Sequence, residues 1–157
     1  MKPKDYAEVA IKPPVLFLGA LLLGYLLTRY FPLGPGLATP NGLGLMVGLI
    51  FVVAGFALAF LSVRRFRLAG TSVVPGEPAA ELVTVGPYRV IRNPIYVGFV
   101  LVYFGMAIVL TSLWTLLLLL PVLVILQRGV ILREEAYLER RFGDAYRKYA
   151  ERVPRWL

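Results

Sequence analysis

Residues 94–132 read PIYVGFVLVYFGMAIVLTSLWTLLLLLPVLVILQRGVIL, and they constrain the architecture more than any other segment. The segment is 39 residues long and carries one charged side chain, Arg128. As a single helix it would be about 58 Å long, against a hydrocarbon core of about 30 Å. Thr111 and Ser112 interrupt the apolar run near its middle. We therefore predict two membrane-crossing helices in a tight hairpin that turns near Thr111 to Trp114.

Two further apolar runs precede this hairpin, at about residues 15–31 and 42–63. The connection between them, residues 32–41, is rich in proline and glycine and carries no charge, which is typical of a short non-helical link. Small residues at regular spacings let helix backbones approach closely in lipid. The second run contains three glycines at spacings of four and seven residues: Gly44, Gly48 and Gly55. We interpret them as a helix-packing surface, which permits a dimer without requiring one.

The composition is that of a membrane protein. Of the 157 residues, 59% are hydrophobic and the mean hydropathy is +0.74, whereas soluble domains average roughly 45–50% apolar residues. We predict an all-α integral membrane protein with about four transmembrane helices in a single domain, residues 1–157. Its predicted parts are two N-terminal spans (1–63), a cytoplasmic loop (64–93), the helical hairpin (94–132) and a cytoplasmic tail (133–157).

The net charge of +8 is concentrated at the ends of the apolar runs. In a membrane protein this favours loops that face anionic headgroups, so we expect membrane lipids and not nucleic acid as partners. The basic segments 64–93 and 133–157 are predicted on one side, and the 32–41 link and the hairpin turn on the other. Under the positive-inside rule both termini lie in the cytoplasm, at the cell (inner) membrane. The first run is interpreted as a retained span and not as a cleaved signal peptide.

The chain contains no cysteine and no histidine. This excludes disulfides and thiolate metal sites, and it removes the commonest metal ligand and the usual general base. We therefore predict no metal. Any chemistry has to rely on Glu, Asp, Tyr, Arg, Asn, backbone groups or a reactive cofactor.

The tail after the hairpin predicts an amphipathic cytoplasmic helix. A stripe of large side chains recurs at steps of four, four and three residues, the spacing of one helix face: Leu138, Phe142, Tyr146 and Tyr149. The Gly-Asp pair at 143–144 interrupts this stripe. We expect one helix to end there and a short one to begin with Asp144 as its N-cap.

Charged side chains flank the hairpin at both of its open ends. Arg89 and Arg92 precede the third helix, whose start at residues 93–94 presents free backbone N–H groups suited to a carboxylate or phosphate. Glu134 and Glu135 follow the fourth helix. Because the hairpin is antiparallel, these groups meet at one membrane face and form a site suited to a zwitterion. Alternatively, the glutamates are surface charges paired with a neighbouring arginine: Arg89, Arg128 or Arg133.

Two separated motifs carry a resemblance to a known family. The first reads LVTVGPYRVIRNPIYVG at 82–98, and the second reads EEAYL at 134–138, followed by FGDAYRKYAERVP at 142–154. Together they resemble the isoprenylcysteine carboxyl methyltransferase family and its bacterial relatives, and membrane phospholipid methyltransferases share a looser version. The resemblance covers about residues 82–155, half of the chain.

The resemblance implies a methyltransferase that uses S-adenosyl-L-methionine (SAM) and releases S-adenosylhomocysteine (SAH). It implies a cofactor site at the cytoplasmic face and a lipid or amphiphilic small-molecule acceptor whose tail enters from the membrane. Arg92 and Glu135 are the implied catalytic residues, and we predict that Arg92→Ala and Glu135→Gln abolish SAM binding or turnover without unfolding. The residues carried over to the cofactor site are Val83, Gly86, Tyr88, Asn93, Pro94, Tyr96, Gly98, Glu134 and Glu135.

The chain departs from the family pattern at Asn93 and Val85, where the prenylcysteine enzymes have histidine. Asparagine can cap a helix and hydrogen-bond a cofactor, but it does not titrate. The acceptor therefore stays open among carboxylates, amines and thiols. Because a sulfonium is already a good electrophile, only an amine acceptor needs a base, and Glu134 or Glu135 is then the candidate.

Two alternatives belong to other functional classes. A membrane lipid or steroid-type reductase that uses NADPH has a loosely similar arginine-proline-tyrosine segment, although the second motif argues against it. A non-catalytic lipid-binding membrane protein that keeps the same fold is the other alternative.

Overall fold

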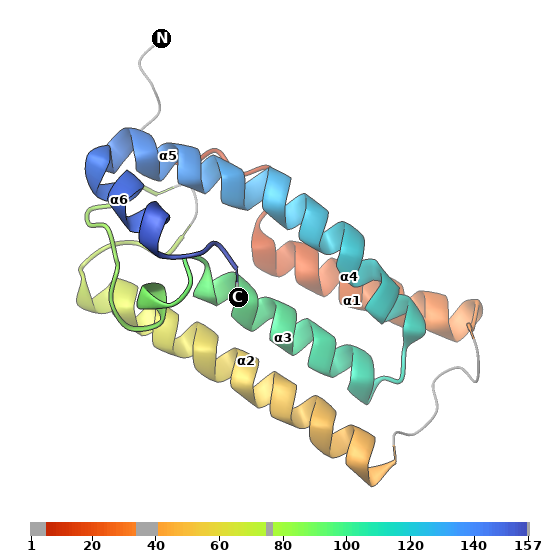
Figure 1. The fold of residues 1–157 in the computed structure, drawn as a ribbon. Helices are drawn as coiled ribbons and strands as arrows, with labels where there is room; N and C mark the ends of the chain where they lie inside the picture. The colour runs from red at the N-terminus through yellow and green to blue at the C-terminus, as the bar shows by residue number, and fades with distance from the viewer. Residues whose placement is uncertain (1–5, 34–40, 75–76, 157) are drawn as a thin grey trace.

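The computed structural model describes residues 6–33, 41–74 and 77–156, and every regular element in these ranges is helical (Figure 1). The all-α prediction is therefore confirmed. The predicted link at 32–41 falls mostly outside these ranges. The α-helices are α1 (Pro13–Tyr30), α2 (Gly42–Leu68), α3 (Pro94–Val109), α4 (Leu113–Leu126), α5 (Leu132–Phe142) and α6 (Asp144–Arg152). Two single turns join them, the 3₁₀ turn η1 (Gly86–Arg89) and the π-helical turn η2 (Gln127–Ile131).

Three helices in the described part of the chain are long and apolar enough to cross a membrane. They are α1, α2 and the continuous helix Leu113–Phe142, which α4, η2 and α5 form together. The α3 helix is apolar but has only 16 residues, which gives about 24 Å against a hydrocarbon core of about 30 Å. These helices make the chain an integral membrane protein, with α3 as a shorter fourth apolar helix.

The hairpin turn lies where the sequence predicts it. The α3 helix ends at Val109 and α4 begins at Leu113. Ser112 caps α4, because its Oγ accepts a hydrogen bond from the backbone N–H of Thr115 at 3.0 Å. The same hydroxyl lies 2.6 Å from the hydroxyl of Thr28 in α1. Since these side chains are buried, their hydrogen bonds fix α1 against the turn.

Four glycines join α2 to α3. A methyl group on Gly98 would lie 2.7 Å from the carbonyl oxygen of Gly55, and one on Gly105 would lie 2.5 Å from that of Gly48. Only a hydrogen atom fits at these contacts, so the two backbones approach as closely as small residues allow. The interpretation of the α2 glycines as a packing surface is confirmed for Gly48 and Gly55, and the partner is α3 of the same chain.

The α2 helix is longer than the sequence analysis expects. The predicted span ends at residue 63, but α2 continues to Leu68 and includes Arg64, Arg65 and Arg67. Arginine is a good helix former, so a run of charges does not by itself end a helix. The helix stops before Gly70, whose φ is +63°. The predicted loop 64–93 therefore begins only after α2 ends.

The tail differs from the prediction in two ways. The α5 helix does not stand apart from the hairpin, because η2 carries α4 directly into it. Gly143, at φ +54°, lies between α5 and α6, so Asp144 is the first residue of α6 and not its N-cap.

The segment before α1 contacts η2, because the carbonyl of Gly129 in η2 accepts a hydrogen bond from the backbone N–H of Ala10 at 2.9 Å. The segment before α1 therefore lies against this turn.

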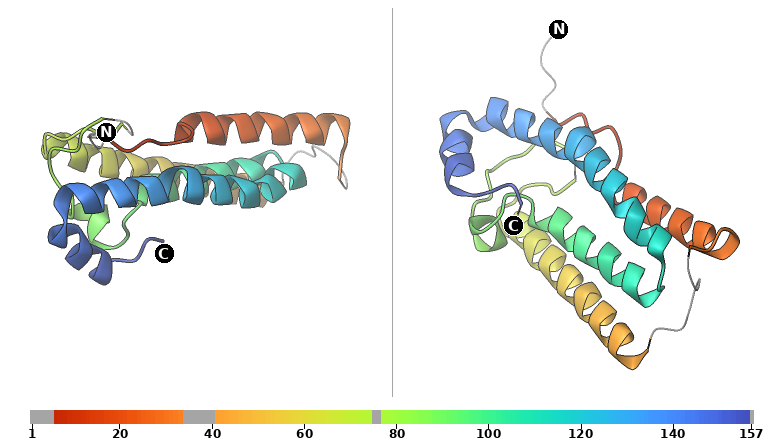
Figure 2. Two further views of the ribbon diagram at one scale, coloured as in Figure 1. Left: turned by 90° about the horizontal axis from the view of Figure 1, so that it is seen from above. Right: turned by 45° about the vertical axis from the view of Figure 1, so that its right-hand side comes forward.

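The helices form a bundle in which α2 packs on α3 and α1 packs on α4 (Figure 1, Figure 2). The ring of Phe17 in α1 contacts Phe99 and Tyr103 of α3 edge-on, at centroid distances of 5.6 and 5.9 Å. The start of α3, the loop before it, α5 and α6 gather at one end of the bundle (Figure 2). The α3–α4 turn lies at the opposite end, so the fold brings the two motifs together.

Candidate active site

A cavity lies among the start of α3, α5, α6 and the loop before η1. Its volume of about 130 Å³ is below the roughly 300–1,000 Å³ of typical ligand sites, so a nucleoside-sized ligand has to extend beyond it. Seven of the residues predicted for the site line it: Val83, Tyr88, Arg92, Asn93, Tyr96, Glu134 and Glu135. Residues that the sequence analysis did not assign to a site also line it: Phe66, Ser72, Glu77, Glu81, Tyr137, Tyr146 and Tyr149.

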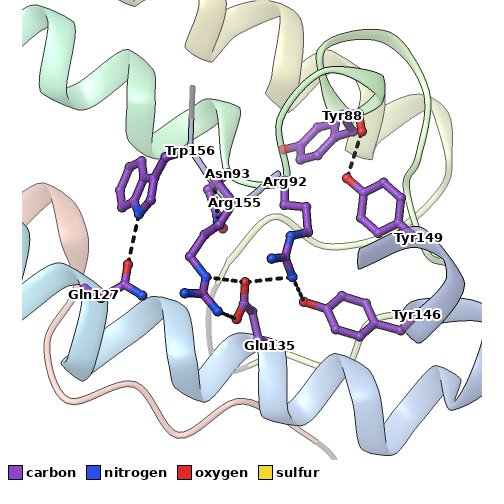
Figure 3. Close-up of polar contacts among 9 residues, drawn as sticks. All are labelled: Tyr88, Arg92, Asn93, Gln127, Glu135, Tyr146, Tyr149, Arg155 and Trp156. Carbon is purple, nitrogen blue, oxygen red and sulfur yellow. Dashed lines mark hydrogen bonds and ion pairs between the residues drawn. The ribbon is translucent and has the colours of Figure 1, made fainter. Parts of the chain in front are cut away.

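Glu135 holds two arginines at the wall of this cavity (Figure 3). Its Oε1 lies 3.1 Å from Nη1 of Arg92 and accepts a hydrogen bond from Nε of Arg155 at 2.9 Å. Its Oε2 accepts a second hydrogen bond from Nη2 of Arg155 at 2.6 Å. The side chains of Arg92 and Glu135 are only 15% and 13% exposed, so solvent screens this pair weakly.

The arginine partners differ from those that the sequence suggests. Glu135 forms ion pairs with Arg92 and Arg155. It does not pair with Arg89, which is exposed and does not line the cavity. The alternative that Glu135 is a surface charge paired with Arg89, Arg128 or Arg133 is therefore wrong. Arg155 directly follows the second motif, and this position is only a weak indication that it belongs to the site.

Residues 153–156, here called the C-terminal strap, run from α6 back to α3 (Figure 1). The backbone N–H of Arg92 donates to the carbonyl of Pro154 at 2.9 Å. At the end of the strap, Nε1 of Trp156 donates to Oε1 of Gln127 in η2 at 3.1 Å. The strap therefore connects both sides of the hairpin next to the paired charges.

Asn93 is the N-cap residue of α3, the position that asparagine favours. Its side chain makes no capping hydrogen bond to α3, and its Nδ2 instead donates to the carbonyl of Arg155 at 3.3 Å. The position of Asn93 is thus the favoured one, but its side chain binds the strap, a partner that the local sequence does not reveal. The α3 helix begins at this point with Pro94, which suits the first helical position.

Glu134 has fewer partners than its neighbour. Its Oε1 accepts a hydrogen bond from the hydroxyl of Tyr96 at 2.7 Å. Within the described ranges, no ion pair involves Glu134. A carboxylate with one hydroxyl partner keeps most of its acceptor capacity. Of the two adjacent glutamates, Glu134 is therefore the one available to face a cation or accept a proton.

Two tyrosines of α6 complete the wall (Figure 3). Nη1 of Arg92 donates to the hydroxyl of Tyr146 at 3.4 Å, and the hydroxyl of Tyr149 donates to the backbone carbonyl of Tyr88 at 2.8 Å. Burial raises the pKa of both phenols, so these hydroxyls stay protonated. The sequence places these tyrosines only in an amphipathic stripe, because their position next to Arg92 and Tyr88 depends on how α6 folds back.

Three residues predicted for the cofactor site lie outside the cavity wall. Gly98 packs against α2, and Pro94 is fully buried at the first position of α3. Gly86 has φ +65°, and a side chain there would collide with that of Arg65. Each of them shapes the backbone near the cavity, and none of them contacts its interior.

Comparisons with known proteins match the same part of the chain. The family model described as phospholipid methyltransferase matches residues 43–145. A protein-S-isoprenylcysteine O-methyltransferase from Schizosaccharomyces pombe is 33% identical over 109 residues, which cover 62% of this chain and 46% of that protein. An uncharacterized protein from Haemophilus influenzae is 49% identical over 35 residues, which cover 22% of this chain and 56% of that protein.

The chain thus spans about half the length of the curated relatives it matches. No solved structure matches it. The matched region runs from the start of α2 into α6 and contains the first motif and the second motif as far as residue 145. On this match, the chain belongs to the phospholipid methyltransferase family of membrane methyltransferases.

Proposed function

We propose that this chain transfers a methyl group from SAM to a membrane-soluble or amphiphilic small molecule at the cytoplasmic face of the cell membrane. The observation that carries the proposal is the cavity where Arg92, Glu134 and Glu135 meet, at the polar end of an apolar bundle. This position suits an acceptor dissolved in lipid and a cofactor that arrives from water. Exposed arginines at the same end support the cytoplasmic side: Arg64, Arg65, Arg67 and Arg89.

The groups at the cavity suit the amino-acid end of SAM. The Nε of Arg92 is buried without a hydrogen-bond partner, which leaves a charged donor for a carboxylate. Glu134 offers an anion to the sulfonium group, which SAH lacks, and the rings of Tyr88 and Tyr96 line the same space. Among the described residues there is no cluster of three or more His, Cys, Asp or Glu side chains that could hold a metal.

The two glutamates have separate roles in this proposal. When bound, SAM supplies a methyl group on a positively charged sulfur. Glu135 acts as a positioning residue, because its carboxylate fixes the guanidinium of Arg92 beside Tyr146 and anchors Arg155 of the strap. Arg92 then holds the anionic end of the cofactor, and the strap limits access of water from one side.

The available carboxylate of Glu134 favours an amine acceptor. An alkyl ammonium group has to lose a proton before its nitrogen can attack the methyl carbon. As the C–N bond forms, the C–S bond breaks, and its electron pair stays on sulfur, which becomes a neutral thioether. Glu134 accepts the proton that nitrogen loses. A carboxylate acceptor needs no base, and the charge of Glu134 would repel it.

Replacement of Glu134 by glutamine is expected to lower kcat by about 100-fold or more, because general bases contribute roughly 10²–10⁴-fold. Affinity for SAH should stay within about threefold of wild type, since Gln can keep a hydrogen bond to Tyr96. Transfer of label from methyl-labelled SAM and titration of SAH measure the two quantities. Glu139→Gln is the matched control, because Glu139 lies on the same helix in an exposed pair with Arg147. Unchanged turnover in Glu134→Gln would exclude the base role.

Calorimetric titration of SAH into the detergent-purified chain tests the proposed function. We expect one saturable site in the wild type and its loss in Arg92→Ala. Titration of NADPH should give no binding heat, which separates this proposal from the reductase alternative. Absence of SAH binding in the wild type would contradict the proposal and favour the non-catalytic lipid-binding alternative.

A further inference from the structure

A second hollow lies between α3 and α4, and it shares no lining residue with the cavity described above. Its volume of about 670 Å³ falls within the roughly 300–1,000 Å³ of typical ligand sites. Apolar side chains of the two helices form its walls: Val97, Val100, Leu101, Leu123 and Val124. Three further residues close one end, here called the rim: Gln127, Arg128 and Trp156. We call the whole hollow the α3–α4 groove.

The rim is polar where the walls are apolar. Arg128 is exposed, and no ion pair of its guanidinium occurs in the part of the chain that the structure describes. Gln127 accepts a hydrogen bond from Trp156 through Oε1, so its amide N–H groups remain free to donate. The rim can therefore bind an anion through the charged guanidinium of Arg128 and the neutral amide N–H groups of Gln127.

The position of the groove indicates that this anion is part of a lipid. Its walls belong to the apolar helices α3 and α4, and Val124 is 53% exposed, so the groove opens towards lipid. Gln127 and Arg128 follow the wall residues of α4 by one turn, where the apolar run gives way to charged residues. A ligand that fills the groove thus combines a hydrocarbon chain with an anionic group at the boundary.

We propose that the α3–α4 groove is a binding site for an anionic phospholipid, separate from the methyl acceptor. One acyl chain lies along the apolar walls, and the phosphate pairs with Arg128 and the amide of Gln127. Trp156 contacts the lipid at the membrane boundary, where its amphipathic ring is favoured. Because Trp156 belongs to the C-terminal strap, the lipid and the Arg92–Glu135 pair contact the same segment (Figure 3).

Native mass spectrometry of the delipidated full chain tests this site. Phosphatidylglycerol and phosphatidylcholine with identical acyl chains are added in turn, and the bound fraction is measured. We expect the wild type to retain phosphatidylglycerol preferentially. Arg128→Gln should weaken phosphatidylglycerol binding about fivefold, since a lysine or arginine near an anionic surface contributes about 1 kcal/mol. Leu101→Trp should weaken binding of both lipids, because the indole fills the groove.

Arg67→Gln is the matched control, because Arg67 is also an exposed arginine at this end but lies outside the groove. It should bind phosphatidylglycerol as the wild type does. Equal binding by Arg128→Gln and wild type would overturn the proposal, as would an equal loss in Arg67→Gln or equal retention of both lipids. Monodisperse elution in size-exclusion chromatography verifies that each variant is folded. The readout is lipid binding, so it is independent of methyl transfer.

Discussion

Gly98→Leu is expected to prevent stable packing of α3 on α2, with a loss of about 3 kcal/mol or more in the free energy of unfolding. A side chain at this position would lie 2.7 Å from the carbonyl oxygen of Gly55 and 3.1 Å from the Cβ of Ala59. Neither backbone can move away without opening the glycine contacts along the whole helix pair. The thermal melting temperature of the detergent-purified protein measures the loss.

Gly19→Leu is the matched control for this change. Gly19 is a helical glycine in α1 with no atom near the position of an added Cβ, and it is exposed. A leucine there faces lipid, so the melting temperature should stay at the wild-type value or rise slightly. If both leucine variants melt at the wild-type temperature, the close packing of α2 on α3 described here is wrong.

Glu135→Gln is expected to weaken SAH binding at least tenfold and to destabilise the fold by about 3 kcal/mol, the lower part of the range for breaking a buried ion pair. The substitution leaves the guanidinium groups of Arg92 and Arg155 facing a neutral amide. Arg92 then loses its orientation, and the C-terminal strap loses its charged anchor. Titration of SAH and thermal melting in the same detergent measure both effects.

Glu139→Gln lies one turn further along α5 and provides the comparison. Its ion pair with Arg147 joins side chains that are 51% and 53% exposed, and such surface pairs contribute little to stability. We expect wild-type melting and wild-type SAH affinity. A Glu135→Gln protein that matches this control in both measurements would show that Glu135 neither positions Arg92 nor anchors the strap.

This expectation revises the one drawn from the sequence. The motifs alone predict that Glu135→Gln removes SAM binding and leaves the fold intact. In the structure Glu135 also carries the bidentate contact with Arg155, so binding and stability should fall together. Glu134, which has only the Tyr96 hydroxyl as a partner, is the glutamate whose loss should affect turnover alone.

Local signals predicted the elements that frame the site. Pro94 marks the first position of α3, and Ser112 supplies the side-chain oxygen that starts α4. The length of the apolar run then requires a hairpin, and an antiparallel hairpin brings Arg92 towards Glu135. These features depend on residues close in sequence or on the thickness of the bilayer, so the sequence was sufficient to predict them.

Other features depend on where distant segments meet. Glu135 pairs with Arg155 and not with Arg89, because the strap returns to the hairpin after α6. The side chain of Asn93 binds that strap and makes no capping hydrogen bond to α3. Gly98 belongs to the α2 contact rather than to the cavity, which is evident only when Gly55 is placed opposite it. No local pattern encodes these three contacts, because each needs the positions of two segments at once.

The most direct measurement is transfer of a labelled methyl group to an extractable lipid. The purified chain is incubated with methyl-labelled SAM and a membrane lipid extract, and mass analysis identifies each molecule that gains a methyl group. We predict a labelled, amine-bearing amphiphile with the wild type and Glu139→Gln, and about 100-fold less with Glu134→Gln. Absence of any labelled lipid, together with absence of SAH binding, would contradict the assignment of this cavity as a methyltransferase site.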